Sequence, residues 1–173
     1  MPREYGPVKP GRKWLKEGVA RIVFFVLGRA FQSAARMDEG IRREVAQWEE
    51  GFRLAMRILP DGPSMGLTKR DGRIRYVGEG SVDADLVIRF KNIESAFLVL
   101  TPQMGSARAF AENRIGLVGD VARSMSFVRC LDRLLAYMYP AFICNRLVKR
   151  MPQIKRPFRR RLYLYVLGIP FGI

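Results

Sequence analysis

Residues 83–100 read DADLVIRFKNIESAFLVL, and the spacing of the apolar residues changes within this stretch. Leu86, Ile88 and Phe90 alternate with other residues, which is the period of a β-strand. A helix is predicted from about Ile93. Because a strand leads directly into a helix here, the stretch indicates a domain that combines both kinds of element.

Three further strands are predicted upstream of this one. Apolar residues alternate in FRLAMRI at 52–58, which predicts a strand with one buried face. PDGP at 60–63 is typical of a turn, and Asp71-Gly72 predicts a tight hairpin between MGLTKR and RIRYVG.

Downstream, the helix is expected to end near Thr101, because the residue before a proline disfavours helical geometry. A short helix is predicted at 106–113, and RIGLVG at 114–119 predicts a fifth strand. Asp120 then suits the N-cap of a long helix. This order of elements predicts an α+β fold in which helices cover one five-stranded mixed sheet.

The N-terminal region predicts two helices. Between 13 and 36 the pattern is helical, and Asp38 suits the N-cap of a second helix in which Ile41, Val45 and Trp48 face inward. Six residues of the first helix share one apolar face, which three phenylalanines broaden. The six are Leu15, Val19, Ile22, Val23, Val26 and Ala30, and the phenylalanines are Phe24, Phe25 and Phe31.

The charge of the chain is concentrated at its two ends. Among 173 residues there are 31 Lys and Arg against 16 Asp and Glu, a net charge of +15. Residues 1–36 carry a balance of +6, residues 37–132 a balance of zero, and residues 133–173 a balance of +9. A neutral middle between two basic ends calls for a single explanation of both ends.

The residue types argue against most catalytic chemistry. The chain has no histidine, the usual general base near neutral pH and the commonest transition-metal ligand. Neither a G-x-S-x-G nucleophile motif nor a G-x-x-x-x-G-K-[ST] phosphate loop is present. Cys130 and Cys144 lie in apolar helical sequence and are expected to be buried free thiols. We expect a protein that is not an enzyme, with no metal and no cofactor.

Asp83 and Asp85 are the strongest exception to this expectation. Two carboxylates on the same side of a strand entry are able to bind Mg²⁺ or Mn²⁺, which prefer oxygen ligands. No third ligand lies nearby, since residue 84 is an alanine. A polar strand entry, in which a carboxylate accepts backbone N–H groups, is the simpler interpretation.

Large flexible apolar side chains are plentiful on elements that should converge. Each of them singly is typical of a core, but together they suit an adaptable apolar cavity. They are Phe90, Phe97, Leu98, Leu100, Met104, Phe110, Ile115, Leu117 and Met125.

The ordered motifs between Gly78 and about Leu135 resemble the sterol carrier protein type-2 domain family. They are RIRYVG, then DADLVIRF, then NIESAFLVLTPQM leading to ARAFAENRIGLVGD, and finally a long helix. With the first two strands the likeness covers about Asp38 to Leu135. The residues at the family's motif positions are Asp85, Phe97, Phe110, Ile115, Leu117, Gly119 and Asp120.

This resemblance implies a hydrophobic tunnel that takes sterols, acyl chains or other lipids. Some bacterial members of the family resemble accessory factors for isoprenoid quinone synthesis, which is the alternative role for this chain. The residues expected to contact the lipid are Leu54, Met56, Leu86, Ile88, Phe90, Phe97, Leu100, Met104, Phe110, Ile115, Leu117 and Met125.

The basic ends predict contact with an anionic membrane surface. Nucleic acid is the alternative partner for such charge, but grooves that bind it use spaced aromatics instead of blocks of leucine and valine. Here the charges adjoin apolar blocks flanked by Trp and Tyr, as at a bilayer interface. The expected surface residues are Trp14, Arg21, Phe25, Lys155, Arg156, Arg159, Arg160, Arg161, Tyr163 and Tyr165.

The sequence therefore predicts three regions. Residues 1–37 form a basic lead with an amphipathic helix, residues 38–138 a lipid-binding domain, and residues 139–173 basic and apolar helices at the membrane surface. No signal peptide is recognised, and no uncharged stretch reaches the ~18 residues of a spanning helix. We expect a cytoplasmic protein, peripheral to the inner membrane face, that carries or presents a lipid, with membrane-bound biosynthetic enzymes as further partners.

Overall fold

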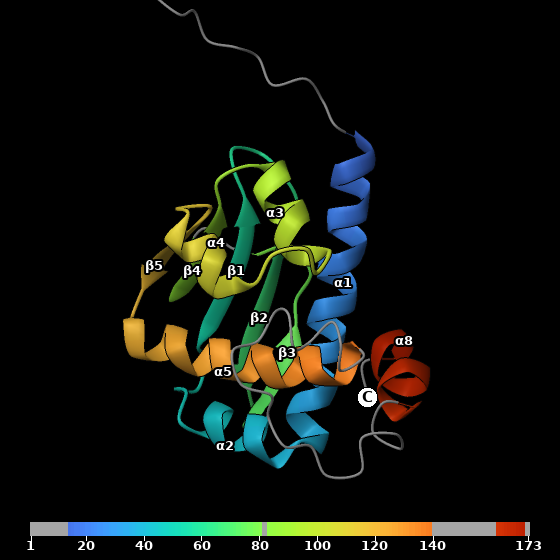
Figure 1. Cartoon of the computed structure of the whole chain (residues 1–173). Coiled ribbons are helices and arrows are strands. Elements are labelled where there is room, and N and C mark those ends of the chain that lie inside the picture. Colours follow the sequence, from blue (N-terminus) through green and yellow to red (C-terminus); the bar gives the residue numbers. More distant parts are fainter. Residues whose placement is uncertain (1–13, 81–82, 140–161, 172–173) are drawn as a thin grey trace, which may run out of the picture.

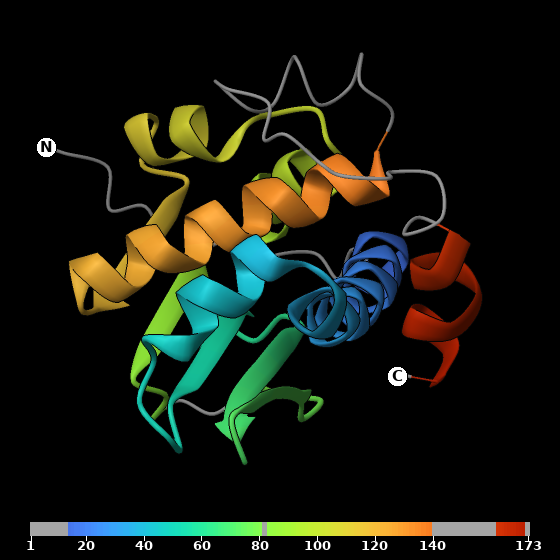
Figure 2. The same ribbon diagram turned by 90° about the horizontal axis from the view of Figure 1, so that it is seen from below.

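The computed structural model describes residues 14–80, 83–139 and 162–171. It confirms the predicted α+β class, with helices on one side of a five-stranded sheet (Figures 1 and 2). The elements are α1 (Trp14–Met37), α2 (Glu39–Ala46), β1 (Arg53–Ile58), β2 (Ser64–Arg70), β3 (Arg73–Tyr76), β4 (Leu86–Phe90), α3 (Ile93–Leu100), α4 (Ser106–Ala111), β5 (Ile115–Gly119), α5 (Val121–Met138), the π-helix η1 (Leu164–Gly168) and α8 (Ile169–Phe171).

The sheet is mixed, as predicted, and its strand order is β3-β2-β1-β4-β5. β1 and β4 run parallel, with Met56 beside Ile88, and every other pair is antiparallel. Parallel neighbours require a crossover, and here the β2–β3 hairpin is part of it. The register places the alternating apolar residues of all five strands on the face that the helices cover, where they form the core.

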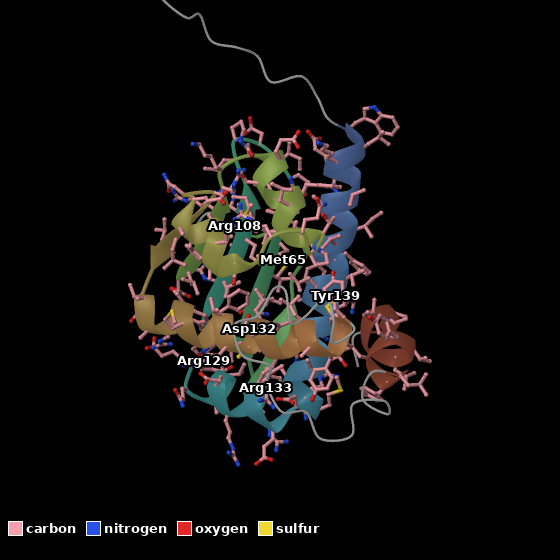
Figure 3. All side chains as sticks on the ribbon, in the orientation of Figure 1. Met65, Arg108, Arg129, Asp132, Arg133 and Tyr139 are labelled. Carbon is pink, nitrogen blue, oxygen red and sulfur yellow. The ribbon has the colours of Figure 1, made fainter. Side chains whose placement is uncertain are left out.

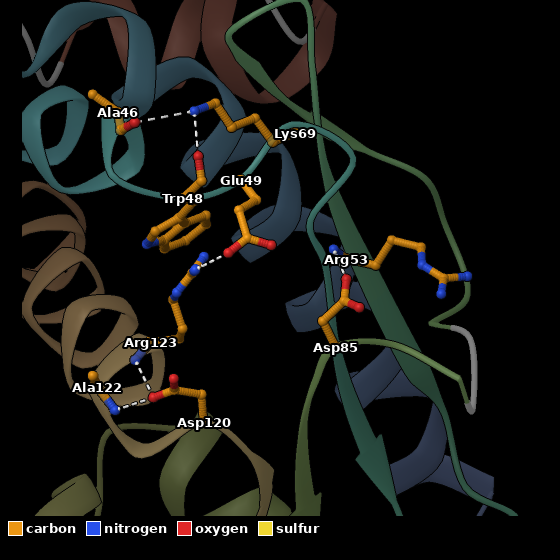
Figure 4. A network of polar contacts seen from close by, with 9 residues as sticks. All are labelled: Ala46, Trp48, Glu49, Arg53, Lys69, Asp85, Asp120, Ala122 and Arg123. Atoms are coloured by element: carbon orange, nitrogen blue, oxygen red, sulfur yellow. Dashed lines mark hydrogen bonds and ion pairs between the residues drawn. The ribbon is translucent and has the colours of Figure 1, made fainter.

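Turn and cap residues act where the sequence predicts. Asp71 and Gly72 have φ of 53° and 67°, the left-handed geometry of a two-residue hairpin. The Asp38 carboxylate accepts a hydrogen bond from the N–H of Ile41 at the start of α2. Asp120 caps α5 by accepting from the backbone N–H groups of Ala122 and Arg123 (Figure 4).

The first strand differs from its prediction in one respect. Ala55 was expected on an open face of β1, but it is fully buried. The segment after β3 crosses this face, and a Cβ added at Gly80 would lie 2.8 Å from the Cβ of Ala55. This close approach explains the glycine at position 80.

Helix α1 buries only part of the apolar side that the sequence predicts, including Phe24, Ala30 and Phe31. Ala20, Phe24, Leu27, Phe31 and Ala34 recur at helical spacing and are buried in the common core. Three residues of the predicted face are instead exposed, namely Leu15, Val19 and Ile22. Both faces of this helix are thus apolar, and the core is built on the one that carries the aromatic rings.

An aromatic cluster joins α1 to α2 and α5. The ring of Phe31 stacks on Trp48 and on Phe127, with centroids 6.3 and 5.5 Å away. Trp48 follows α2, and its carbonyl oxygen accepts a hydrogen bond of 2.7 Å from the buried amino group of Lys69 (Figure 4). The three helices are therefore fixed to one another and to the sheet.

The C-terminal helical piece lies against the second half of α1 (Figures 1 and 2). Leu164 is fully buried there, and a Cβ added at Gly168 would lie 2.5 Å from the Oγ of Ser33. The predicted helix at 140–151 lies outside the described residues.

Candidate functional site

An apolar pocket opens between α1, α3 and α5, above β1. Its volume is about 60 Å³. Small-molecule pockets usually enclose ~300–1,000 Å³, so this pocket is much smaller than a usual ligand site in this conformation. The pocket is lined by Val23, Leu27, Met56, Val99, Leu100, Pro102, Met104, Gly105, Ser106, Leu131, Asp132, Leu135, Met138 and Tyr139.

Of the residues predicted from sequence to contact a lipid, three line this pocket: Met56, Leu100 and Met104. They come from β1, the end of α3 and the loop after it. Two of the three are methionines, whose unbranched side chains adapt to different shapes. The pocket wall is therefore well suited to rearrangement.

The other nine predicted contacts lie elsewhere. Phe110 and Met125 are 38% and 53% exposed, on α4 and α5, and do not line this pocket. Phe97 and Leu117 are half-buried. The remaining five are core residues that do not line the pocket: Leu54, Leu86, Ile88, Phe90 and Ile115.

Sequence reasoning missed the pocket walls that α1 and α5 provide. Val23 and Leu27 were assigned to a helix outside the lipid-binding region, although α1 contributes to the common core. Leu131, Leu135 and Met138 recur at the spacing of one helical face, which was a signal for a shared surface on α5.

Helix α5 is held against α2 by two sets of charged contacts. Arg129 binds both carboxylate oxygens of Glu44, at 2.7 and 2.8 Å. Ser126 donates 2.8 Å to the same carboxylate and accepts 2.9 Å from the indole N–H of Trp48. These hydrogen bonds, led by the one from Arg129, hold the pKa of Glu44 below its ordinary value. One turn along α5, Arg133 binds Asp38 in the same bidentate way.

Asp132 lies on α5 between these two arginines and lines the pocket (Figure 3). Its side chain is half-buried, and burial raises the pKa of its carboxyl group. Within the described part of the chain it makes no hydrogen bond and no ion pair. An apolar pocket thus has one acidic group in its wall.

The Asp83 and Asp85 pair is a polar strand entry at least in part. The Asp85 carboxylate accepts a 2.7 Å hydrogen bond from the N–H of Arg53 on the neighbouring strand (Figure 4). The donor belongs to β1. Among the described residues, no group of three or more Cys, Asp or Glu is placed to hold a metal ion.

Cys130 is a buried free thiol, as predicted, and burial raises its pKa to about 12. Thiolate formation is therefore suppressed at neutral pH. Cys144 lies outside the described residues.

The predicted membrane-surface residues at the N-terminal end are exposed on α1. Trp14 is 71% exposed, Phe25 is 41% exposed, and Arg21 also faces solvent. At the other end Tyr165 is exposed and Tyr163 half-buried. Five of the predicted residues lie outside the described ranges: Lys155, Arg156, Arg159, Arg160 and Arg161.

Helix α1 is long and apolar enough to cross a bilayer by length and composition. Half of its most apolar window is buried inside the protein, however, and core helices of soluble proteins meet the same criterion. Its exposed apolar residues are Trp14, Leu15, Val19, Ile22 and Phe25.

No protein-family model matches the chain, and no curated protein sequence matches it. Similar solved structures include a conserved hypothetical protein of Thermus thermophilus, described as a candidate sterol carrier protein. It shares 22% identity over 63% of this chain and 81% of its own, with a TM-score of 0.45. A UbiJ-SCP2 ubiquinone synthesis protein shares 15% identity over 72% of this chain and 99% of its own, with a TM-score of 0.43.

The sterol carrier protein domain 2 of Helicoverpa armigera shares 11% identity over 73% of this chain and 89% of its own, with a TM-score of 0.45. Sterol carrier proteins are thus among the solved structures with a similar arrangement of elements.

Proposed function

We propose that the chain binds the apolar part of a lipid in the pocket between α1, α3 and α5, and presents it at a membrane surface. The observation that carries the proposal is a wall of flexible apolar side chains, including Met56, Met104 and Met138, that converge from separate elements on one opening. The lipid is of the sterol, acyl-chain or isoprenoid-quinone type.

A lipid tail needs more room than the pocket has now. The present volume is about 60 Å³, well below the ~300–1,000 Å³ of usual small-molecule sites. Binding therefore includes displacement of the side chains in the wall. Methionine and leucine change rotamer without leaving a polar group unsatisfied, so a lipid tail replaces contacts among apolar residues by similar contacts with itself.

The exposed face of α1 supports the membrane part of the proposal. Val23 lines the pocket, and Val19 lies one helical turn before it and is 39% exposed. Leu15, Val19 and Ile22 share one face of the helix, so a continuous apolar strip leads from the outer surface of α1 toward the pocket. A lipid that moves along this strip keeps its tail out of water, where exposure would cost ~0.8 kcal/mol per CH₂ group.

The proposal is tested by filling the pocket. Leu131→Trp places a larger side chain in the pocket wall, whereas Met125→Trp places the same indole ring on the exposed side of the same helix. We expect Leu131→Trp to weaken binding of the neutral apolar dye Nile red by at least about tenfold, a loss of ~1.4 kcal/mol. The control variant should bind as the wild type does. A folded Leu131→Trp protein with unchanged dye affinity would place binding outside this pocket.

The partners that receive the lipid are, in this proposal, the membrane and enzymes of lipid or quinone synthesis within it. The sequence resemblance motivates the enzymes, and co-purification from detergent-solubilised membranes tests them. Recovery of the chain alone would leave the membrane surface as the acceptor.

A further inference from the structure

The pocket wall contains an acidic side chain that lacks the arginine partner of several other acids of the domain. Asp38 is bound by Arg133, Glu44 by Arg129, and Glu112 by two arginines. Asp132 makes no such contact within the described residues, although it lies next to Arg133 in sequence. The guanidinium groups of Arg129 and Arg133 turn toward α2 instead, on another side of α5.

An unpaired carboxylate in an apolar wall is costly. Partial removal of a charged group from water without compensation destabilises the folded protein. The raised pKa of Asp132 has burial as its cause and no hydrogen bond or charge to offset it. In a chain with 31 basic and 16 acidic residues, a cation partner would be easy to supply. The described residues supply none at this position, so the carboxylate is available to a donor group of a ligand in the pocket.

We propose that Asp132 receives the polar end of the bound lipid, and that this end is a hydroxyl group which donates a hydrogen bond to the carboxylate. The inference rests on the proposed function, since it concerns the same pocket. It names the class of ligand: an apolar molecule that ends in an alcohol or phenol.

The chemistry of the wall separates this class from other lipids. An ionised carboxylate only accepts hydrogen bonds, so a fatty acid anion or a phosphate would meet repulsion instead of a donor. An ammonium group would pair with Asp132, but its burial costs far more than that of a hydroxyl, and the net charge of +15 repels cations. Ser106 and Tyr139 also line the pocket and add further uncharged polar groups beside a hydroxyl.

A matched pair of ligands tests the proposal. Dodecanol and dodecanoate have the same chain length and differ in the polar end. Each is titrated against Nile red bound to the full chain at about pH 8, where a free carboxylic acid is ionised. For the wild type we expect dodecanol to displace the dye at a concentration about tenfold lower than dodecanoate, since hydrogen bonds to charged groups are the strong ones.

Asp132→Asn removes the charge at nearly constant size and should bring the two ligands to within about twofold of each other, because the tenfold preference depends on the carboxylate. Asp132→Ser is a second variant with the same expectation. Asp61→Asn, which removes a charge from an exposed turn, should keep the wild-type preference. Displacement by both ligands at equal concentration, unaltered in Asp132→Asn, would overturn the role of Asp132 and leave the lipid pocket standing. Failure of wild-type protein to bind Nile red or either ligand would refute the proposed function itself.

Discussion

Arg133 of α5 and Asp38, the residue before α2, form a buried ion pair in which Nε and Nη2 donate to the two carboxylate oxygens at 2.8 and 3.1 Å. The hydroxyl of Tyr137 donates to the same carboxylate, which also caps α2 through the N–H of Ile41. One side chain therefore joins the corner between α1 and α2 to the helix that forms a wall of the pocket. Removal of this carboxylate should lower the stability of the whole domain.

Asp38→Asn should lower the free energy of unfolding by about 2–3 kcal/mol, because it leaves the half-buried guanidinium of Arg133 without its counter-charge. Asparagine still caps a helix, so the loss reports the ion pair and not the cap. Guanidinium chloride unfolding at neutral pH measures it. Glu39→Gln is the matched control: its pair with Arg43 is exposed, and its loss should cost less than about 0.5 kcal/mol. Equal effects of the two variants would contradict the assignment.

The same carboxylate makes stability depend on pH. Burial raises the pKa of Asp38, but hydrogen bonds from Arg133, Tyr137 and Ile41 lower it more, to about 2 from an ordinary value of 3.8. A depressed carboxyl pKa contributes stability that is fully present above the unfolded-state value and is lost as pH falls through the folded-state value. The contribution is about 2 kcal/mol.

We therefore expect wild-type stability to decrease between about pH 5 and pH 2 by about this amount more than that of Asp38→Asn. Urea unfolding at a series of pH values measures the difference. Parallel pH profiles for the two proteins would show that Asp38 has an ordinary pKa in the folded state.

The order and type of the elements could be predicted from sequence because each depends on local features. Alternation identified β4, Asp71-Gly72 identified the hairpin, and Asp120 identified the start of α5. The face that α1 buries could not be predicted, because both of its faces are apolar and periodicity does not choose between them. The choice depends on long-range packing of Phe24 and Phe31 against the rest of the core.

The pocket was predicted less well than the fold, for a related reason. Met56, Leu100 and Met104 were found because large flexible apolar residues recur on converging elements. Asp132 was not found, because an acid in a helix is ordinarily a solvated residue. Among the described residues its carboxylate has no cation partner, because the neighbouring arginines bind acidic residues in and just before α2. The direction of those arginines depends on the position of α2, which the sequence does not give.

Two glycines of α1 provide a test of how that helix is seated. A Cβ added at Gly28 would lie 2.3 Å from Cδ2 of Tyr76 on β3, whereas one added at Gly18 meets nothing within 4 Å. Gly28→Ala should therefore destabilise the protein by about 1–3 kcal/mol through overpacking. Gly18→Ala should stabilise it by about 0.5–1 kcal/mol through helix propensity. Thermal unfolding of both variants measures the contrast, and a stabilising Gly28→Ala would mean that α1 lies farther from the sheet.

Asp132→Asn should stabilise the ligand-free protein at neutral pH, by about 0.5 kcal/mol for a half-exposed site. A carboxyl whose folded-state pKa is raised contributes stability that is present at low pH and is lost as pH rises through that pKa. The advantage of the variant should therefore disappear near pH 3. Urea unfolding at neutral pH and near pH 3 measures the difference in stability between the two proteins. A variant less stable than the wild type at both pH values would indicate that Asp132 has a stabilising partner.

The last prediction concerns membrane attachment through the exposed apolar strip of α1. Ile22 is 65% exposed and shares a helix face with Leu15 and Val19, so insertion of this face into a bilayer would bury it. Ile22→Ser should reduce co-flotation with vesicles of phosphatidylcholine and phosphatidylglycerol by about tenfold at low salt, since burial of such a side chain contributes about 1.5–3 kcal/mol.

Val118→Ser is the matched control for this experiment, because Val118 is 45% exposed on β5, at the opposite edge of the sheet from the strand that contacts α1. It should float as the wild type does. If both variants lose flotation equally, the membrane contacts the protein without preference for α1. If neither loses it, the basic charge holds the protein at the surface, and added salt should then release it.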